Sequence, residues 1–213
     1  LGAASLFGMA GLPAAAFAQA PAAGQPPAGL VTDVSGDAVA ELKDSRRMLA
    51  AEGPVFVGDR VYFAIGEPEA GTGPGALRCI DATKRGDVTK TAELWRLGGE
   101  EFSDSISTVA VHDGLVYAVD TPGFLSCIDA ATGKRLWVDD LKSNTWGSPL
   151  VADGKVYVQT AEGTVGVFAA GREKKLLAKN ETLPDLAHGT PTAANGVLYL
   201  TGQKQLFAIA VEK

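Results

Sequence analysis

The sequence HDGLVYAVD, from His112 to Asp120, combines a two-residue Asp-Gly turn with a short, mainly apolar strand. This hairpin signal occurs three more times, as VGDRVYFAI (Val57 to Ile65), ADGKVYVQT (Ala152 to Thr160) and ANGVLYLTG (Ala194 to Gly202). The tyrosines of the four copies are 55, 40 and 42 residues apart, and they are Tyr62, Tyr117, Tyr157 and Tyr199. A repeat with this period indicates that one structural unit has been duplicated.

Each full copy contains four strand signals, which are clearest in the third. Residues 147–152 (GSPLVA) form the first signal, Asp153-Gly154 a tight hairpin turn, and residues 155–160 (KVYVQT) a second, alternating strand. Residues 164–170 (TVGVFAA) and 175–179 (KLLAK) supply the other two strands. Four antiparallel strands in about 40 residues are typical of a propeller blade. The sequence therefore predicts an all-β chain, a β-propeller of about four four-stranded blades.

The second copy continues into CIDAATGKRLW, from Cys127 to Trp137. This stretch resembles the tryptophan-docking repeat of the pyrroloquinoline quinone (PQQ)-like propellers, in which a small residue and Asp precede Thr-Gly-Lys and Trp. Asp129 can accept bonds from backbone N–H groups in the turn, Gly133 permits a positive φ, and Trp137 offers a flat surface to the next blade. The resemblance extends from about Gly53 to the C-terminus and implies a structural docking motif made of Asp129, Thr132, Gly133, Lys134 and Trp137.

The other copies depart from this repeat. The first keeps CIDAT, from Cys79 to Thr83, and then inserts residues before Trp95. The third has Ala169 in place of the Asp and Leu177 in place of the Trp, and the fourth ends after LFAIAVEK. We therefore expect aliphatic packing to replace the tryptophan between the later blades.

About four blades are fewer than complete PQQ-like propellers have. The preferred interpretation is a partial propeller, an open arc with exposed edge strands. The alternative is a closed ring in which the fourth copy borrows its outer strand from Ala38–Ala51 (AVAELKDSRRMLAA). That segment can be aligned with Val165–Lys179 as a strand, a turn and a strand, and its composition also suits a helix.

The N-terminal residues 1–20 are apolar and carry no charge. They end in Ala-x-Ala patterns that a signal peptidase could cut, while several glycines and Pro13 disfavour a spanning helix. We interpret residues 1–20 as the remnant of an export signal, residues 21–29 as a flexible Pro/Ala/Gly linker, and residues 30–213 as PQQ-like blades. The mature protein is then predicted to be periplasmic or secreted, without a stable membrane span.

The composition and the reactive residues exclude several functions. A net charge of −6 offers no basic surface for nucleic acid. Cys79 and Cys127 occupy equivalent positions in adjacent copies and are expected to be unpaired core residues, and His112 a solvated turn residue. The sequence contains no catalytic Ser-His-acid spacing and no metal-binding motif. We therefore predict no catalytic residue and no metal ligand.

One position does suggest a binding site. Ile106, Trp146 and His188 align just before the first strand of consecutive copies, and hydroxyl residues follow each of them. First strands line the central channel of a propeller, so Trp146, Ser148, His188 and Thr190 are predicted to surround one mouth of that channel, where a planar polar ligand could bind. The alternative is that these residues only pack and cap the strand starts.

The resemblance implies two functions. The preferred one is an exported, non-catalytic scaffold that binds protein partners, similar to the propeller subunit of the outer-membrane β-barrel assembly machinery. The alternative is part of a PQQ-dependent alcohol or sugar dehydrogenase, a quinoprotein oxidoreductase. Such enzymes hold PQQ with a stacked Trp, adjacent cysteines and a Ca²⁺ site of Glu, Asn and Asp, and this sequence has no adjacent cysteines. We therefore expect no cofactor, with PQQ and Ca²⁺ as the alternative.

Overall fold

The computed structural model describes residues 53–66, 75–180, 183 and 188–210, which contain fifteen strands in four antiparallel sheets. Blade 1 consists of β1 (Val55–Val57), β2 (Arg60–Ile65), β3 (Ala76–Asp81) and β4 (Glu93–Gly98). Blade 2 consists of β5 (Ala110–His112), β6 (Leu115–Val119), β7 (Phe124–Asp129) and β8 (Arg135–Asp140). Blade 3 consists of β9 (Leu150–Ala152), β10 (Lys155–Gln159), β11 (Val165–Ala169) and β12 (Leu176–Asn180). Blade 4 consists of β13 (Thr192–Ala194), β14 (Val197–Thr201) and β15 (Leu206–Ala210).

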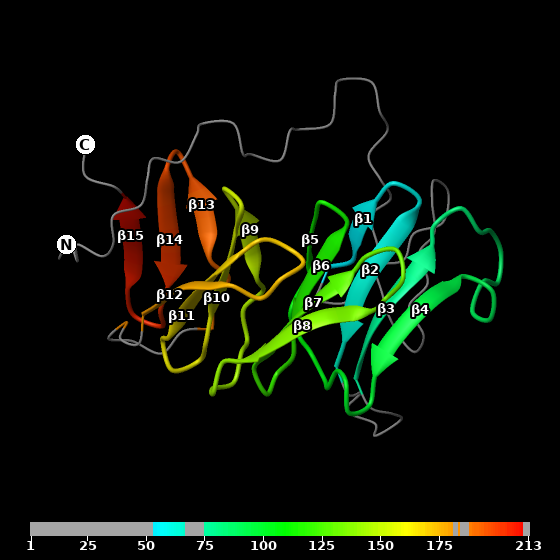
Figure 1. The fold of residues 1–213 in the computed structure, drawn as a ribbon, viewed down its shortest axis with the longest axis horizontal. Helices are drawn as coiled ribbons and strands as arrows, with labels where there is room; N and C mark the ends of the chain where they lie inside the picture. The colour runs from blue at the N-terminus through cyan, green and yellow to red at the C-terminus, as the bar shows by residue number, and fades with distance from the viewer. Residues whose placement is uncertain (1–52, 67–74, 181–182, 184–187, 211–213) are drawn as a thin grey trace.

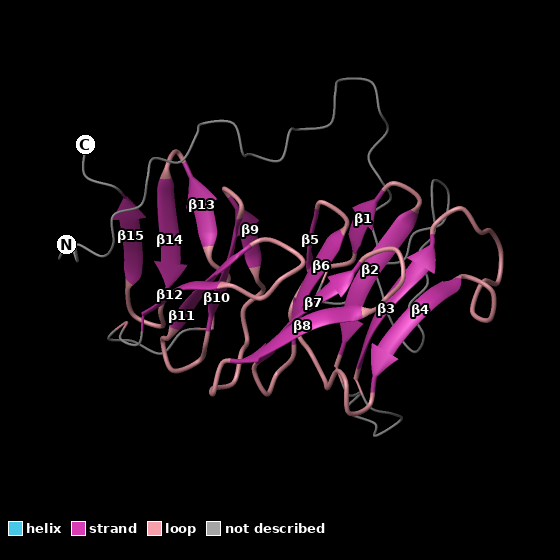
Figure 2. Cartoon of the chain, viewed as in Figure 1, coloured by secondary structure: helices cyan, strands magenta, loops and turns pink. Residues whose placement is uncertain are grey.

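The four blades follow one another along the longest axis of the molecule, with blade 1 at one end and blade 4 at the other (Figure 1). Within each blade the strand order is the chain order. The described residues form strands and loops and no helix (Figure 2). Because the two end blades do not meet, the propeller is an open arc. The prediction of an all-β, partial propeller with about four blades is confirmed.

The hairpin turns follow directly from the residues that the repeat places there. In blades 2, 3 and 4 both turn residues have a positive φ: 47° and 72° at Asp113-Gly114, 50° and 65° at Asp153-Gly154, and 53° and 75° at Asn195-Gly196. Two consecutive positive φ values make a type I′ turn, whose twist matches that of the flanking strands. The turn chemistry therefore sets the register between the first and second strands.

That register is the same in every blade. The tyrosine of the second strand pairs with a residue of the third strand, namely Cys79, Cys127, Val167 and Ala208 in blades 1 to 4. Because strand side chains alternate between the two faces, each blade has a forward face, which carries this tyrosine, and a backward face. The forward face of one blade packs on the backward face of the next.

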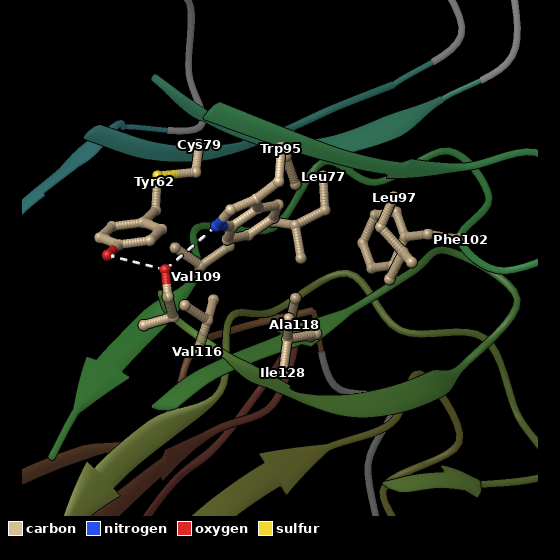
Figure 3. Packing of buried hydrophobic residues seen from close by; sticks show 12 residues of the cluster. Tyr62, Leu77, Cys79, Trp95, Leu97, Phe102, Val109, Val116, Ala118 and Ile128 are labelled. Atoms are coloured by element: carbon tan, nitrogen blue, oxygen red, sulfur yellow. Dashed lines mark hydrogen bonds between the residues drawn. The ribbon is translucent and has the colours of Figure 1, made fainter. Parts of the chain in front are cut away.

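Three apolar clusters lie between consecutive blades. The cluster between blades 1 and 2 includes Tyr62, Leu77 and Trp95 of blade 1 and Val116 and Ile128 of blade 2 (Figure 3). Equivalent clusters join blades 2 and 3 and blades 3 and 4. Burial of each large aliphatic side chain contributes about 1.5–3 kcal/mol, so these clusters hold the blades in order.

Two tryptophans bridge consecutive blades. Trp95 Nε1 donates to the carbonyl oxygen of Ala130 at 3.0 Å, and the Tyr62 hydroxyl donates to the same oxygen at 3.3 Å (Figure 3). One blade further, Trp137 Nε1 donates to the Gly171 carbonyl at 3.0 Å. Each indole thus covers the forward face of its own blade and binds the turn of the next.

The turn that receives Trp95 is built around Asp129. Asp129 Oδ1 accepts from the backbone nitrogens of Ala131 (3.2 Å) and Thr132 (3.0 Å) and from the Thr132 hydroxyl (2.9 Å). Lys134 closes the turn through its backbone carbonyl, which accepts from the Asp129 nitrogen at 2.9 Å. Gly133 has a φ of 74°, and a Cβ on it would lie 2.7 Å from the Trp95 ring, so this position requires glycine.

In blade 3, sequence alignment located the tryptophan position wrongly. Trp95 pairs with Cys79 and Trp137 with Cys127, each beside a one-residue bulge. In blade 3 the residue opposite Val167 is Ala178, and Leu177 falls at the bulge. The prediction that Leu177 replaces the tryptophan is therefore wrong by one residue. The reason is the turn between β11 and β12, in which five residues separate Ala169 from Lys175, where four separate Asp129 from Lys134 in blade 2. Ala169 does occupy the place of the Asp, since its nitrogen donates to the Lys175 carbonyl at 2.9 Å.

The predicted export signal, the linker and the segment Ala38–Ala51 lie outside the described residues. In the part of the chain that is described, no helix is long and apolar enough to cross a membrane. The domain boundaries stay predictions.

Candidate functional site

The aligned residues Ile106, Trp146 and His188 precede β5, β9 and β13 and are exposed to solvent. The indole of Trp146 and the imidazole of His188 lie together, with ring centroids 5.4 Å apart and an angle of 36° between the planes. Trp146 keeps 44% of its surface exposed, whereas Trp95 and Trp137 keep 9% and 8%. We call the three aligned residues the mouth surface.

A ladder of hydrogen bonds supports this surface from below. The Ser107 hydroxyl donates to the Gly147 carbonyl at 3.0 Å, and the Ser148 hydroxyl accepts from the Thr108 nitrogen at 2.8 Å. One blade further, the Thr190 hydroxyl accepts from the Ser148 nitrogen at 2.9 Å. The two predicted binding hydroxyls, Ser148 and Thr190, are thus brought together with the aromatic pair, and each holds neighbouring blades together.

The backbones of adjacent blades lie very close together where these hydrogen bonds form. A Cβ on Gly147 would lie 2.1 Å from the Gly189 carbonyl oxygen, and a Cβ on Gly189 would lie 2.8 Å from the Thr201 Cβ. Gly147 therefore lets the chain before β9 approach the chain before β13, and Gly189 lets the latter pass close to Thr201 at the end of β14 in its own blade. The repeated Gly-Ser-Pro and Gly-Thr-Pro sequences were the signal that could have identified this contact.

Sequence reasoning missed Asp120, a buried acid at the end of β6. Its carboxylate accepts from the backbone nitrogens of Phe124 (2.7 Å), Gly123 (3.1 Å) and Ser103 (3.4 Å). Burial raises the pKa of Asp120 despite these bonds. In blade 3 the hydroxyl of Thr160 occupies the same place and accepts from the Thr164 nitrogen at 3.1 Å. Asp120 is therefore a turn-forming group.

The cysteines lie in the core, as predicted. Cys79 and Cys127 are both buried and unpaired, and burial raises the pKa of the Cys127 thiol to about 11. His112 lies in the hairpin of blade 2 with its Nε2 3.2 Å from the Asp113 carboxylate. Among the described residues, no three His, Cys, Asp or Glu side chains are close enough to hold a metal ion. The described residues therefore offer no carboxylate cluster that could hold the Ca²⁺ ion of a Ca²⁺–quinone pair.

An ion pair connects blades 2 and 3 on the outer side. Arg172 donates to Asp129 Oδ2 at 2.8 Å, while the other carboxylate oxygen organises the docking turn. Hydrogen bonds from Arg172 and Thr132 hold the pKa of Asp129 below its usual value. The ionised carboxylate therefore stabilises the folded state at neutral pH.

The Asp129→Asn variant should show this linkage. A carboxyl whose pKa is lower in the folded state stabilises above its unfolded pKa, about 3.9, and that stability is lost as the pH falls through the folded value. We expect the variant to be less stable than the parent at pH 7 and the difference to shrink below about pH 4. Urea unfolding of both proteins from pH 7 to pH 3 measures it. Arg172→Gln is the matched control and should remove part of the same difference; a gap that does not change with pH would contradict the assignment.

The sequence of this chain matches a known protein family. The family model described as outer membrane protein assembly factor BamB matches residues 75–211. The chain is 31% identical over 132 residues to the outer membrane protein assembly factor BamB of Burkholderia pseudomallei (strain K96243), which covers 62% of this chain and 30% of that protein. It is 43% identical over 65 residues to 1-butanol dehydrogenase (cytochrome c) of Thauera butanivorans, which covers 28% of this chain and 9% of that enzyme.

A solved structure agrees on the fold. The crystal structure of BamB from Moraxella catarrhalis superposes with a TM-score of 0.54 at 20% sequence identity, covering 73% of this chain and 41% of that one. The chain thus spans less than half the length of the BamB proteins it matches. The family model covers well over half of the chain, from the third strand of blade 1 to the end of blade 4. The chain is therefore a PQQ-like propeller protein that belongs to the family of the outer membrane protein assembly factor BamB.

Proposed function

We propose that this chain is an exported, non-catalytic scaffold that binds a protein partner through the mouth surface of Ile106, Trp146 and His188. The observation that carries the proposal is the exposed Trp146–His188 pair, with centroids 5.4 Å apart, at aligned positions of consecutive blades. Tryptophan is among the residues that most often dominate the binding energy of protein interfaces. An exposed indole on a rigid repeat is therefore the natural anchor for a partner.

The support beneath the surface favours binding. The hydroxyls of Ser148 and Thr190 and the close approach of Gly147 and Gly189 fix the spacing of the strand starts before any partner arrives. Little conformational entropy is then lost on binding, since the backbone that carries Trp146 is already held. The exposed ring of Trp146 also offers a surface on which a planar polar ligand can stack.

The relatives indicate which partner to expect. Their name, outer membrane protein assembly factor, places BamB proteins in the assembly of outer-membrane proteins. We therefore propose that this chain is periplasmic or secreted, and that its partner is a protein of the outer-membrane assembly apparatus. The apolar, uncharged residues 1–20 support export.

Photo-crosslinking in the cell envelope tests this function. The change Trp146→p-benzoylphenylalanine places the crosslinker on the mouth surface, and Leu176→p-benzoylphenylalanine is the matched control, because Leu176 is similarly exposed, at 52%, but lies on the outer strand of blade 3. We expect a crosslink to an outer-membrane assembly protein from position 146 and none from position 176. Crosslinks only to cytoplasmic proteins, or equal crosslinks from both positions, would refute the proposal.

A dehydrogenase function is the second candidate, and the 43% identity to 1-butanol dehydrogenase over 65 residues favours it. Under this alternative the mouth surface would hold PQQ, with Trp146 stacked against the quinone. Calorimetric titration of the folded chain with PQQ, with and without Ca²⁺, distinguishes the two functions. A saturable, Ca²⁺-dependent, one-to-one binding curve that is lost in Trp146→Ala would favour the dehydrogenase, and the scaffold proposal expects no such curve.

A further inference from the structure

The three interfaces between blades use the same residue positions. These positions predict which residues a sheet would need in order to pack on the forward face of blade 4. On the backward face, alternate residues of the second strand pack on the preceding blade: Val116 and Ala118 in blade 2, Val156 and Val158 in blade 3, and Leu198 and Leu200 in blade 4. On the forward face the partners are the tyrosine and the apolar third-strand residue that lies two positions before the residue opposite the tyrosine, namely Leu77, Leu125 and Val165. Every such contact is fully desolvated and apolar.

The forward face of blade 4 has the same design and no partner among the described residues. Leu206 pairs with Thr201 as Leu77, Leu125 and Val165 pair with their own second strands. Those three counterparts are 0%, 0% and 4% exposed, whereas Leu206 is 65% exposed. Tyr199 on the same face is half-buried, although the equivalent tyrosines of blades 1 to 3 are buried.

Blade 4 also has an open edge. In blades 1 to 3 the third strand pairs with a fourth, but in the described residues β15 pairs only with β14. Within the described ranges no strand pairs with the outer side of β15, and exposed sheet edges commonly accept another strand. The open face and the open edge belong to the same blade.

The opposite end of the arc is covered. In blade 1 the Asp81 nitrogen donates to the Ala92 carbonyl, and ten residues lie between them. The equivalent bond of blade 2, from Asp129 to Lys134, encloses four residues. Ala82 and Val88 of this insertion, together with Ala92 that follows it, pack on Val61, Phe63 and Ile80, the backward face of blade 1. The insertion forms the loop between β3 and β4, at the blade 1 end of the arc (Figure 1). The blade 1 end is thus capped in the way that terminal repeats are, whereas no described residue covers the forward face of blade 4.

We propose that the forward face and outer edge of blade 4 bind an antiparallel β-sheet of a partner protein. The partner sheet would lay alternating Val, Ala or Leu side chains on Tyr199, Leu206 and Ala208, as the second strand of a blade does at the three internal interfaces. This surface continues the interface that is repeated along the chain, because Tyr199 and Leu206 stand at the positions that contact the next blade in blades 1 to 3. This second surface is separate from the mouth surface and does not depend on it.

A second copy of the chain is not the proposed occupant. The backward face that could continue the arc is covered in each copy by its own insertion. Two forward faces meeting each other would place leucine and tyrosine against leucine and tyrosine, instead of against the small branched residues that fill the internal interfaces. A second copy is therefore a poor fit to this face. If residues of the chain outside the described ranges cover it, the parent will bind neither of the probes below.

A variant of the chain itself can serve as the test sheet. In this probe, residues 82–91 are replaced by Ala-Ala-Thr-Gly, the turn of residues 130–133, which removes the cap from blade 1 and exposes its backward face. The probe also carries Leu206→Asp, so that it cannot bind itself. We expect it to form a one-to-one complex with the parent chain in sedimentation velocity experiments. A Val88→Asp, Leu206→Asp chain is a second probe, which displaces the cap without shortening the loop.

The parent chain is then varied. Leu206→Asp should weaken the complex at least about tenfold, because an unpaired carboxylate would be buried at the interface. Leu176→Asp is the matched control, with an exposed leucine on the adjacent blade, and should bind like the parent. The proposal is overturned if neither probe, shown by circular dichroism to be folded, binds the parent. It is also overturned if the parent chain alone forms a dimer that Leu206→Asp dissociates, since the occupant would then be a second copy.

Discussion

Replacing Trp137 by alanine is expected to lower the free energy of unfolding by about 3–5 kcal/mol, among the largest single-residue effects in this chain. The indole lies between Tyr117 and Phe168, with ring centroids 6.0 and 5.9 Å away, and is 8% exposed. Its removal leaves a cavity between blades 2 and 3. It also removes the hydrogen bond from Trp137 Nε1 to the Gly171 carbonyl. The remaining side-chain donor to that carbonyl is the Cys127 thiol, at 3.6 Å. For a chain of this size the loss corresponds to a fall in Tm of roughly 6–20 °C.

Two controls separate the contributions to this loss. Trp95→Ala should cost somewhat less, because the Ala130 carbonyl keeps the bonds from Tyr62 and Arg60. Trp146→Ala removes the same side chain from a site that is 44% exposed and should change stability by no more than about 0.5 kcal/mol. Urea unfolding followed by circular dichroism measures all three variants. Equal losses at positions 137 and 146 would mean that the indole between the blades does not hold them together.

The fold could be predicted from the sequence because local chemistry and long-range packing agree in this chain. The Asp-Gly and Asn-Gly turns, the alternating strands and the position of Trp137 all specify the same blade, and the structure has each of them. The error at Leu177 shows the limit of such reasoning. The bulge is the same in blades 1 to 3, but the turn before β12 is one residue longer than the turn before β8, and the strand pattern carries no signal for that difference. The position opposite Val167 is therefore Ala178.

The candidate site was predictable in part. Alignment of the copies identified Trp146 and His188 as neighbours across two blades, and their rings do lie together. It did not show that Ser148 and Thr190 bind backbone groups of adjacent blades, because the distance between inner strands is set by packing. Nor did it show that the insertion after Asp81 covers the backward face of blade 1, or that Leu206 of blade 4 is 65% exposed. Both features depend on how whole blades meet, which no single strand pattern encodes.

The Gly147→Ala variant tests whether the mouth surface depends on close backbone contact. The new Cβ would lie 2.1 Å from the Gly189 carbonyl oxygen and 2.7 Å from its carbon, so blades 3 and 4 must separate locally to admit it. Overpacking of this kind costs about 1–3 kcal/mol, and rigid backbone on the other side places the expected cost near the upper end. Because Ser148 follows directly, its bond to Thr190 should lengthen and the contact of Trp146 with His188 should loosen.

Gly171→Ala is the control for this variant, since a Cβ added to Gly171 would meet no atom within 4 Å and the residue has no positive φ. It should be within about 0.5 kcal/mol of the parent. Urea unfolding gives the stabilities, and fluorescence quenching by iodide of proteins that keep Trp146 but carry Trp95→Phe and Trp137→Phe reports on the mouth surface alone. We expect Gly147→Ala to be the less stable variant and its Trp146 to be quenched more strongly than in Gly171→Ala. If both glycine variants match the parent in stability and quenching, the ladder beneath Trp146 tolerates wider spacing, and the mouth surface is not held rigid by its backbone.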